Sequence, residues 1–282
     1  MAYTPKARAL GAVLRRIREE KGLTLRDVTQ GIHLDAGSMS RWENGERVPK
    51  PETVSQILTW YGVAGARFHE IMTLAHRTGE PQWIATSEPE QRQQLMAYVS
   101  WEQSATKIFA VSPLLVPGLL QTEEYIEAMM VTDDIPAAEI KSNVAERVDR
   151  RQAIHGQKPA HFLVLLGQSA LNQHIGGRRV TIDQIRYLVK QAALPNIELR
   201  VVPDRRGWHP GLEGSFSLIE ATPGRNGSIV FVDTRRSVAM LHEDADVSAY
   251  RRAVDRIMRV SLSPEVTVNY LADLVRRLEL ER

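Results

Sequence analysis

Basic and amide side chains cluster in the segment DAGSMSRWENGERVPK, which runs from Asp35 to Lys50. The guanidinium of Arg41 is able to donate two hydrogen bonds to O6 and N7 of one guanine. Asn44, Arg47 and Lys50 follow it in and after a turn, where amide and cationic groups suit contacts with phosphate oxygens. This is the chemistry of a DNA-contacting segment, and it requires a helix that turns Arg41 outward.

A short helix from Asp35 to Gly45 meets that requirement. The Asp35 carboxylate is placed as an N-cap, and Gly45 as the stop. Met39 and Trp42 are expected to be the buried pair of this helix, three residues apart, which turns the other positions toward solvent. The candidate base contacts are therefore Ala36, Gly37, Ser38, Ser40 and Arg41.

Backbone N–H groups at helix starts near Leu25 and Ala36 add a second kind of phosphate ligand. Arg41 has an alternative role, an intramolecular salt bridge, which would leave it unavailable to a base. The candidate contacts to the DNA backbone are Thr24, Leu25, Arg26, Asn44, Arg47 and Lys50.

The helices that must position this segment are also indicated. Apolar residues recur at helical spacing from Leu10 to Ile17, and Gly22 ends that run. Thr24 with Asp27 three residues later predicts a capped second helix, and Pro51 is suited to open a fourth. With a fifth helix in ARFHEIMTLAHR, the pattern predicts an all-α bundle of five helices. The alternative is a plain helical bundle whose basic residues form a solvated face.

The segment LTLRDVTQGIHLDAGSMSRWENGERVP resembles the helix-turn-helix of the XRE, or lambda-repressor-like, family of bacterial regulators. The resemblance implies a DNA-binding transcription regulator, with Glu43 bracing the motif internally. It departs from many relatives at Ala36 and Gly37, whose small size predicts close approach to the groove. The matching positions are Thr24, Leu25, Val28, Ile32, Leu34, Ser40, Arg41, Glu43, Gly45 and Pro49.

The domain organisation follows from composition and periodicity. Residues 1–78 form the predicted helix-turn-helix domain, residues 79–92 a linker with two prolines, and residues 93–282 a larger domain. In the larger domain, HFLVLLG, NIELRVVP and three later segments predict strands, and AAEIKSNVAERVDRRQAIHG predicts one long helix. The fold class is therefore α+β overall, with an all-α N-terminal domain followed by a mixed α/β sheet domain.

From about residue 95 onward, the chain is also similar to the uncharacterised C-terminal domain of a large actinobacterial regulator family, described as antitoxin-like. The segments that carry this likeness are VSPLLVPGLLQTEEYIEAMM, ERVDRRQAI, GQSALNQHIGG and QIRYLVKQAALPNIELRVVP. The resemblance implies a small partner protein encoded nearby. This chain departs from it with Gln168 and Asp233, where relatives carry a carboxylate and Glu.

The loop GWHPGLEGSF is a plausible place for a ligand contact. The candidate ligand or partner pocket consists of Arg151, Gln168, Trp208, His209, Glu213 and Asp233. A catalytic role is not expected, because the sequence has no nucleophile elbow, no phosphate-binding glycine loop and no His-Glu-x-x-His. No cofactor or metal is expected either.

Composition constrains the cellular setting. The chain has 282 residues, no cysteine and a formal net charge of +2. A reducing cytoplasm suits a chain without disulfides, with nucleoid association when DNA is bound. A homodimer is expected, because two half-sites multiply the few base contacts of one small module.

Overall fold

The computed structural model of the chain describes residues 4–80, 82–85, 87–133, 135–221, 227–233 and 238–280. The chain forms two compact units, and each combines segments that are distant in sequence. Unit 1 comprises residues 1–104 and 220–247, and unit 2 comprises residues 105–219 and 248–282.

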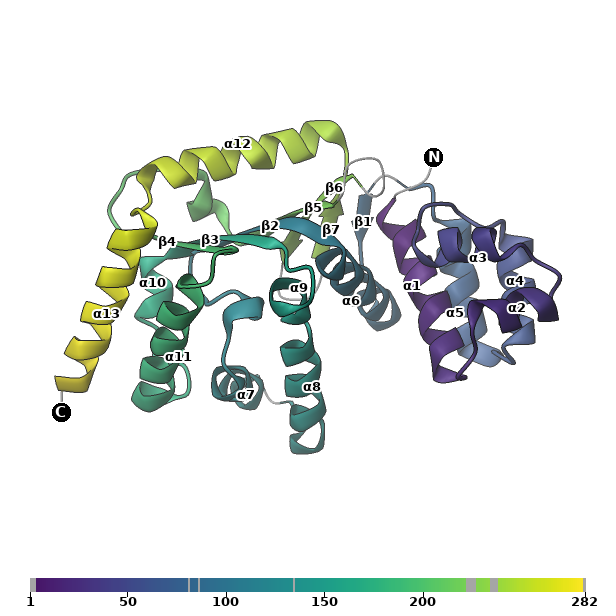
Figure 1. Ribbon diagram of the computed structural model, residues 1–282, viewed down its shortest axis with the longest axis horizontal. Coiled ribbons are helices and arrows are strands. Elements are labelled where there is room, and N and C mark those ends of the chain that lie inside the picture. The colour runs from purple at the N-terminus through teal and green to yellow at the C-terminus, as the bar shows by residue number, and fades with distance from the viewer. Residues whose placement is uncertain are drawn as a thin grey trace. The chain divides into compact units, whose positions relative to one another are not determined.

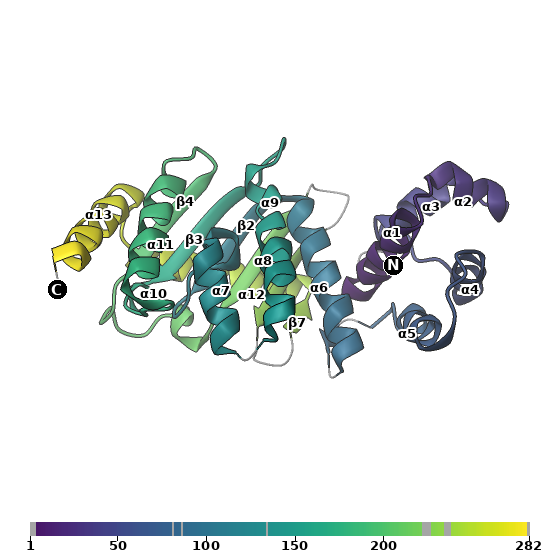
Figure 2. The same ribbon diagram turned by 90° about the horizontal axis from the view of Figure 1, so that it is seen from below.

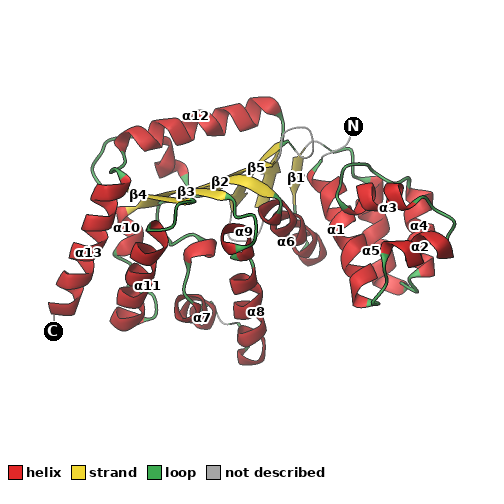
Figure 3. Cartoon of the chain, viewed as in Figure 1, coloured by secondary structure: helices red, strands yellow, loops and turns green. Residues whose placement is uncertain are grey.

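Unit 1 opens with helices alone (Figures 1 and 3). The apolar stripe from Leu10 to Ile17 is buried, which confirms the predicted inner face of the first helix. The helices of the described residues 4–80 are α1 (Pro5–Glu20), α2 (Leu25–Gly31), α3 (Ala36–Glu43), α4 (Pro51–Trp60) and α5 (Gly65–His76).

The predicted helix ends are confirmed by their hydrogen bonds. The Thr24 hydroxyl accepts from the Asp27 N–H, and the Asp27 carboxylate accepts from the Thr24 N–H. The Asp35 carboxylate accepts from the Ser38 N–H at 2.7 Å. Beyond α3, Gly45 has a φ of 70°, which a residue with a Cβ adopts only at a cost. The chain therefore turns sharply there, between α3 and α4.

A buried cation connects α1 to α6 (Glu88–Gln103), also in unit 1. Arg8 is 5% exposed, and its guanidinium donates to the Ser100 carbonyl at 2.7 Å and lies 4.3 Å from the ring centroid of Trp101. Burial, with a smaller contribution from Arg15, lowers the pKa of Arg8 to about 10. Hydrogen bonds and the aromatic face thus replace part of the water that this cation loses, while its Nη1 is buried without a hydrogen-bond partner among the described residues.

Lys6, also in α1 and 2% exposed, forms an ion pair with Glu80, which lies between α5 and β1 (Gln82–Ile84). Arg77 also donates to the Glu80 carboxylate, at 2.7 Å. Hydrogen bonds from Arg77 and Lys6 lower the pKa of Glu80 to about 2. Because its pKa is lowered in the folded chain, the carboxylate stabilises unit 1 above its ordinary pKa, and this contribution is lost as the pH falls toward 2.

Glu80→Gln should therefore reduce the loss of stability in acid. Between pH 5 and pH 3, the thermal unfolding midpoint of the unaltered chain should fall further than that of the variant. Glu52→Gln, which removes an exposed carboxylate from the first turn of α4, should keep the full pH dependence. An identical pH profile for Glu80→Gln and the unaltered chain would show that this carboxylate contributes nothing.

The rest of unit 1 holds short antiparallel strands. The strand β1 (Gln82–Ile84) pairs with β7 (Val238–Leu241), and β7 pairs with β6 (Ser228–Asp233). The Gln94 amide of α6 donates to the Trp83 carbonyl at 2.9 Å and to the Val238 carbonyl at 2.7 Å. The segment predicted as a linker, residues 79–92, thus contains β1 and the start of α6.

Unit 2 contains a parallel ladder of three strands, β2 (Ala105–Ser112), β3 (His161–Gly167) and β4 (Ile197–Val202), with β3 paired to both others. Phe162 through Leu166 are all buried, as expected for a parallel strand covered on both faces. Strand β5 (Phe216–Ala221) leads the chain from unit 2 into unit 1. Parallel and antiparallel pairing both occur, so the predicted mixed α/β class is confirmed.

Helices cover both faces of the parallel ladder. In Figures 1 and 2, α7, α8 and α11 lie on one face and α12 lies on the other. Among the described helices, none has both the length and the apolar character needed to cross a membrane. The helical elements of this region are η1 (Gly118–Leu120), α7 (Glu123–Thr132), α8 (Ala137–Asp149), α9 (Gln152–His155), α10 (Gln168–Leu171), α11 (Gly177–Ala192), η2 (Pro210–Glu213), α12 (Asp244–Val260) and α13 (Pro264–Leu280).

The prediction of one long helix over residues 137–156 is wrong. The helix is interrupted between α8 and α9, where the Arg151 N–H bonds to the Val148 carbonyl and the Ile154 N–H to the Arg151 carbonyl, three residues back in each case. These tighter turns separate the two helices. Ile154 in α9 is buried, whereas α8 has no buried residue.

Candidate nucleic-acid interface

Glu43 anchors the end of α3 to α1. Its side chain is 2% exposed, and the Arg18 guanidinium donates two hydrogen bonds to it, from Nε to Oε1 at 2.7 Å and from Nη2 to Oε2 at 2.8 Å. Hydrogen bonding to Glu43 raises the pKa of Arg18 against the opposing effect of burial. Arg18 also donates to the Leu23 carbonyl at 2.8 Å. The internal bracing expected of Glu43 is therefore present, with Arg18 as its partner.

The buried face of α3 differs from its prediction by one residue. Met39 is fully buried, as expected, but Trp42 is only partly buried, and Glu43 takes the inner position. Residues four apart lie on the same helix face, so Met39 and Glu43 form the inner pair. Gly37, Ser38, Ser40 and Arg41 are each partly exposed on α3. The Ala36 backbone is helical, and its side chain lies outside the described residues.

Arg41 lies against the first turn of its own helix. Its Nη2 is 3.5 Å from an Asp35 carboxylate oxygen and donates to the Ser38 hydroxyl at 3.2 Å. The side chains of Arg41 and Asp35 are 41% and 71% exposed, so solvent screens their attraction and the pair is weak. A bidentate contact to guanine contributes about 1–3 kcal/mol. The intramolecular salt bridge is thus present, and a base could displace it.

Gly37 makes room for this arrangement. A Cβ at this position would lie 3.1 Å from Nη1 of Arg41 and 3.2 Å from the Asp35 carboxylate. The absence of a Cβ at Gly37 therefore leaves room for the Arg41 guanidinium beside Asp35 in the first turn.

The candidate phosphate contacts lie on α2 and on the connection from α3 to α4. Thr24, Arg26, Arg47 and Lys50 are exposed, and Leu25 is partly exposed. Asn44, partly exposed, differs because its side-chain oxygen accepts a hydrogen bond from Arg15. The roles assigned to these residues remain predictions.

Arg15 is a candidate that the sequence did not reveal. It lies on α1 with its side chain 41% exposed, bonded to Asn44 and 3.6 Å from the Glu43 carboxylate. Its spacing, three residues before Arg18, places both arginines on one face of α1. That spacing is the signal that could have linked Arg15 to the end of α3.

Four of the six residues of the predicted C-terminal pocket lie in the lining of one cavity or next to it in sequence, namely Gln168, Trp208, His209 and Glu213, whereas Arg151 and Asp233 do not. His209 lines a cavity of about 320 Å³ in unit 2, and Gln168 stands between two of its lining residues, Gly167 and Ser169. Arg151 donates to the Gln121 carbonyl. The remaining members are Trp208, 67% exposed, Glu213 in η2, and Asp233 at the end of β6 in unit 1. Their common role stays a prediction.

Metal chemistry has no visible site in the described part of the chain. No three His, Asp or Glu side chains of those residues are grouped to hold an ion.

Comparison with known proteins gives two matches. Residues 9–71 match the family described as a helix-turn-helix domain, and the match runs from within α1 into α5. Residues 95–273 match the family described as a domain of unknown function, DUF5753. No curated protein and no solved structure matches the chain. The second match spans more than half of the sequence, so the chain belongs to the DUF5753 family and carries an N-terminal helix-turn-helix domain.

Proposed function

We propose that this protein is a sequence-specific DNA-binding transcription regulator whose recognition helix is α3. The observation that carries the proposal is the fixed position of α3. Glu43 and Met39 hold its inner face, while Arg41 stays at the surface beside small residues. In helix-turn-helix proteins the N-terminal part of the second helix of the motif enters the major groove.

The proposed division of labour follows from side-chain chemistry. Arg41 reads guanine, with Ser38 and Ser40 as secondary polar contacts, and the first turn at Ala36 and Gly37 approaches the groove closely. Thr24, Leu25, Arg26, Asn44, Arg47 and Lys50 contact phosphates and set the position of α3 without reading sequence. We expect strong preference at one guanine and weak preference elsewhere.

We further propose a homodimer, because a single small module makes few base contacts and two half-sites together give adequate discrimination. Such a regulator would act in the cytoplasm, bound to the nucleoid. Sedimentation with and without a two-half-site duplex would test the dimer. One chain bound per duplex would contradict it.

Arg41→Ala tests the reading role. A preferred duplex is first selected from random DNA with the unaltered chain, and affinities are then measured by fluorescence anisotropy. Arg41→Ala should reduce the preference for the selected duplex over random DNA by about 5- to 150-fold, the equivalent of about 1–3 kcal/mol. Lys50→Ala should weaken binding to both duplexes alike and reduce the salt slope by about one.

Arg67→Ala is the matched control, since it removes an exposed cation from α5, outside the motif. It should leave the preference unchanged. Equal losses on selected and random DNA for Arg41→Ala would refute its reading role. Failure of the unaltered chain to prefer any duplex would refute the proposed function itself.

The C-terminal domain is proposed to bind a ligand or a small partner protein rather than to catalyse a reaction. An antitoxin-like role, with sequestration of a small protein as the main task, is a second candidate. It is favoured by α8, which has no buried residue although Ile140, Val144 and Val148 lie at helical spacing. Co-purification of a neighbouring gene product at fixed stoichiometry would support that role, and its loss on Val144→Asp would locate it.

A further inference from the structure

A cavity in unit 2 lies where three parallel strands end. Ser112, Gly167 and Val202 are the last residues of β2, β3 and β4, and residues at or just beyond these ends line the cavity. Open α/β sheets bind ligands outside the carboxyl ends of their strands. The volume of about 320 Å³ falls within the range of small-molecule sites.

The inner wall of the cavity is apolar. Val111, Leu165, Val202 and Ile257 line it, and all four are at most 6% exposed. Two further lining residues, Leu114 and Leu212, are 59% and 62% exposed. These exposed leucines extend the apolar wall to the surface, so the site suits a molecule with an aliphatic body.

The loop after β4 is held in place over this wall. The Gln168 side-chain oxygen accepts from the Asp204 N–H at 3.0 Å, and the Ser169 hydroxyl donates to the Asp204 carboxylate at 3.0 Å. Next to Asp204, Arg205 has a φ of 65°, an uncommon conformation for a residue with a Cβ. Strained backbone fixed by neighbouring contacts is typical of binding sites.

The opening of the cavity is cationic. Arg205 and Arg206 line it, both exposed, and neither forms an ion pair with another described residue. The one lining carboxylate, Asp204, is engaged by Ser169. Two guanidinium groups against one carboxylate leave a net charge of +1, which favours an anionic group on the ligand.

His209 provides one buried polar atom in the lining. It is 8% exposed, and its Nδ1 has no hydrogen-bond partner among the described residues. Burial lowers the pKa of His209, so the imidazole is neutral at neutral pH. The Nδ1 atom lies 3.0 Å from the position that a Cβ of Gly211 would take, so the imidazole packs within the protein and contributes its ring to the wall of the cavity.

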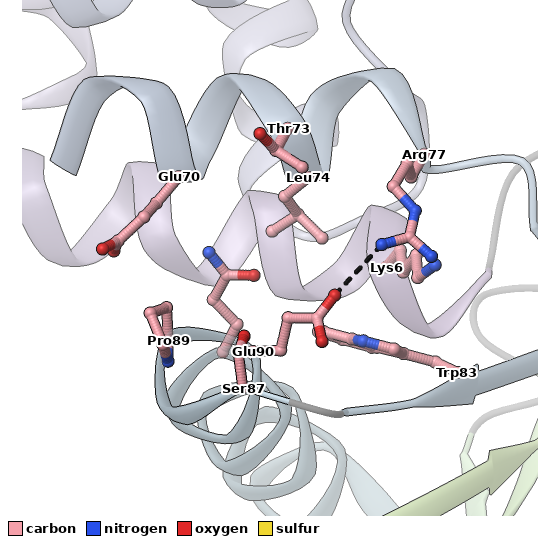
Figure 4. Close-up of a pocket in the computed structure, with 10 residues that line it drawn as sticks. Lys6, Glu70, Thr73, Leu74, Arg77, Trp83, Ser87, Pro89 and Glu90 are labelled. Carbon is pink, nitrogen blue, oxygen red and sulfur yellow. Dashed lines mark hydrogen bonds and ion pairs between the residues drawn. The ribbon is translucent and has the colours of Figure 1, made fainter. Parts of the chain in front are cut away.

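A second cavity, in unit 1, lacks these features (Figure 4). Its volume is about 170 Å³, and Lys6, Arg77 and Glu90 are among its lining residues. Arg77 pairs with Glu90 at 3.1 Å, as the dashed line shows, and Lys6 pairs with Glu80. Both of its lining cations are thus paired with carboxylates of the protein, so nothing there calls for an anion.

We propose that the cavity at the ends of β2, β3 and β4 binds a small aliphatic carboxylic acid. The chain of the acid lies against the apolar wall, and its carboxylate is held by Arg205 and Arg206. This inference deepens the proposed ligand-binding role of the C-terminal domain and gives that ligand a chemical class.

Three probes with the same aliphatic chain test the class of ligand. Calorimetric titration of the full chain with octanoate, octan-1-ol and octylamine should show octanoate binding at one site per chain. We expect octanoate to bind about 10-fold or more tightly than octan-1-ol, since charge-assisted hydrogen bonds contribute on that scale. Octylamine should bind most weakly of the three.

Variants of the two arginines at the opening of the cavity test whether these residues bind the carboxylate. The double change Arg205→Gln with Arg206→Gln should weaken the binding of octanoate about 10-fold or more and leave the affinity for octan-1-ol unchanged. Both residues are exposed, so the fold should persist. Arg179→Gln with Lys190→Gln removes two exposed cations from α11 and should change neither affinity.

Absence of octanoate binding, tighter binding of octan-1-ol, or no effect of the Arg205 and Arg206 changes would each overturn the inference. None of these outcomes bears on the DNA preference measured with Arg41→Ala. Failure of the ligand site and failure of the proposed DNA-binding function are therefore distinguishable.

Discussion

Glu43→Ala should lower the free energy of unfolding of the helix-turn-helix region by about 3–5 kcal/mol, the usual cost of removing one partner from a buried ion pair. The change leaves the Arg18 guanidinium, whose side chain is 12% exposed, without its two bonds to the carboxylate. Arg15 loses a neighbouring anion as well. Because Glu43 is the last residue of α3, the loss falls on the helix proposed to enter DNA.

Hydrogen exchange of the full chain is the suitable measurement, since it reports α1 and α3 separately from unit 2. Amides of both helices should exchange faster in Glu43→Ala, while those of β3 should be unaffected. Preference for the selected duplex should disappear at the same time. Glu43→Gln keeps one acceptor for Arg18, so its amide exchange rates in α1 and α3 should lie between those of the unaltered chain and those of Glu43→Ala.

Glu19→Ala is the matched control because Glu19 also faces Arg18, at 3.5 Å, but with its side chain 61% exposed. An exposed pair contributes about 0–1 kcal/mol, so exchange in α1 and α3 should change little. If Glu43→Ala and Glu19→Ala behaved alike, the proposed bracing of α3 would be wrong.

The sequence predicts the helix-turn-helix region well because its signals are local. The caps at Thr24 and Asp35, the stop at Gly45 and the start at Pro51 each depend on residues within a few positions. The apolar stripe of α1 is also a local pattern. Such features survive folding unchanged, and the helices of residues 4–80 confirm them.

Contacts between distant residues were not predictable in the same way. Glu43 was expected to brace the motif, but its partner Arg18 lies on another helix. Lys6 and Arg8 are buried against Glu80 and α6, although lysine and arginine are ordinarily exposed. Neither charge nor periodicity distinguishes such a cation from one in solvent.

The cavity of unit 2 illustrates the same limit. His209 is a candidate from the sequence because its loop, GWHPGLEGSF, places Trp, His and Glu between predicted strands, which is a local signal. The apolar wall combines Val111, Leu165 and Val202 from three strands, and their meeting depends on strand pairing. Only the paired strands bring the loop and the wall together.

Gly11→Ala should destabilise the helix-turn-helix region by about 1–3 kcal/mol through overpacking. A Cβ at Gly11 would lie 2.2 Å from the Trp42 carbonyl oxygen and 2.8 Å from that of Glu43. These are backbone atoms at the end of α3, so no side-chain rotation can relieve the clash. Alanine in a helix interior otherwise gains about 0.5–1 kcal/mol over glycine, which the clash outweighs.

The sign of the change in stability shows whether close packing against α3 or helix propensity dominates at Gly11. If α1 and α3 pack as closely as these distances indicate, Gly11→Ala moves the end of α3 and lowers both stability and DNA preference. Gly79→Ala, at a glycine with no atom within 4 Å of the added Cβ, should leave both unchanged. A Gly11→Ala chain more stable than the original would mean that helix propensity dominates and that α3 does not depend on this contact. The position of the proposed reading helix therefore depends on the absence of a Cβ at Gly11 in α1, as well as on the Glu43 carboxylate that Arg18 binds.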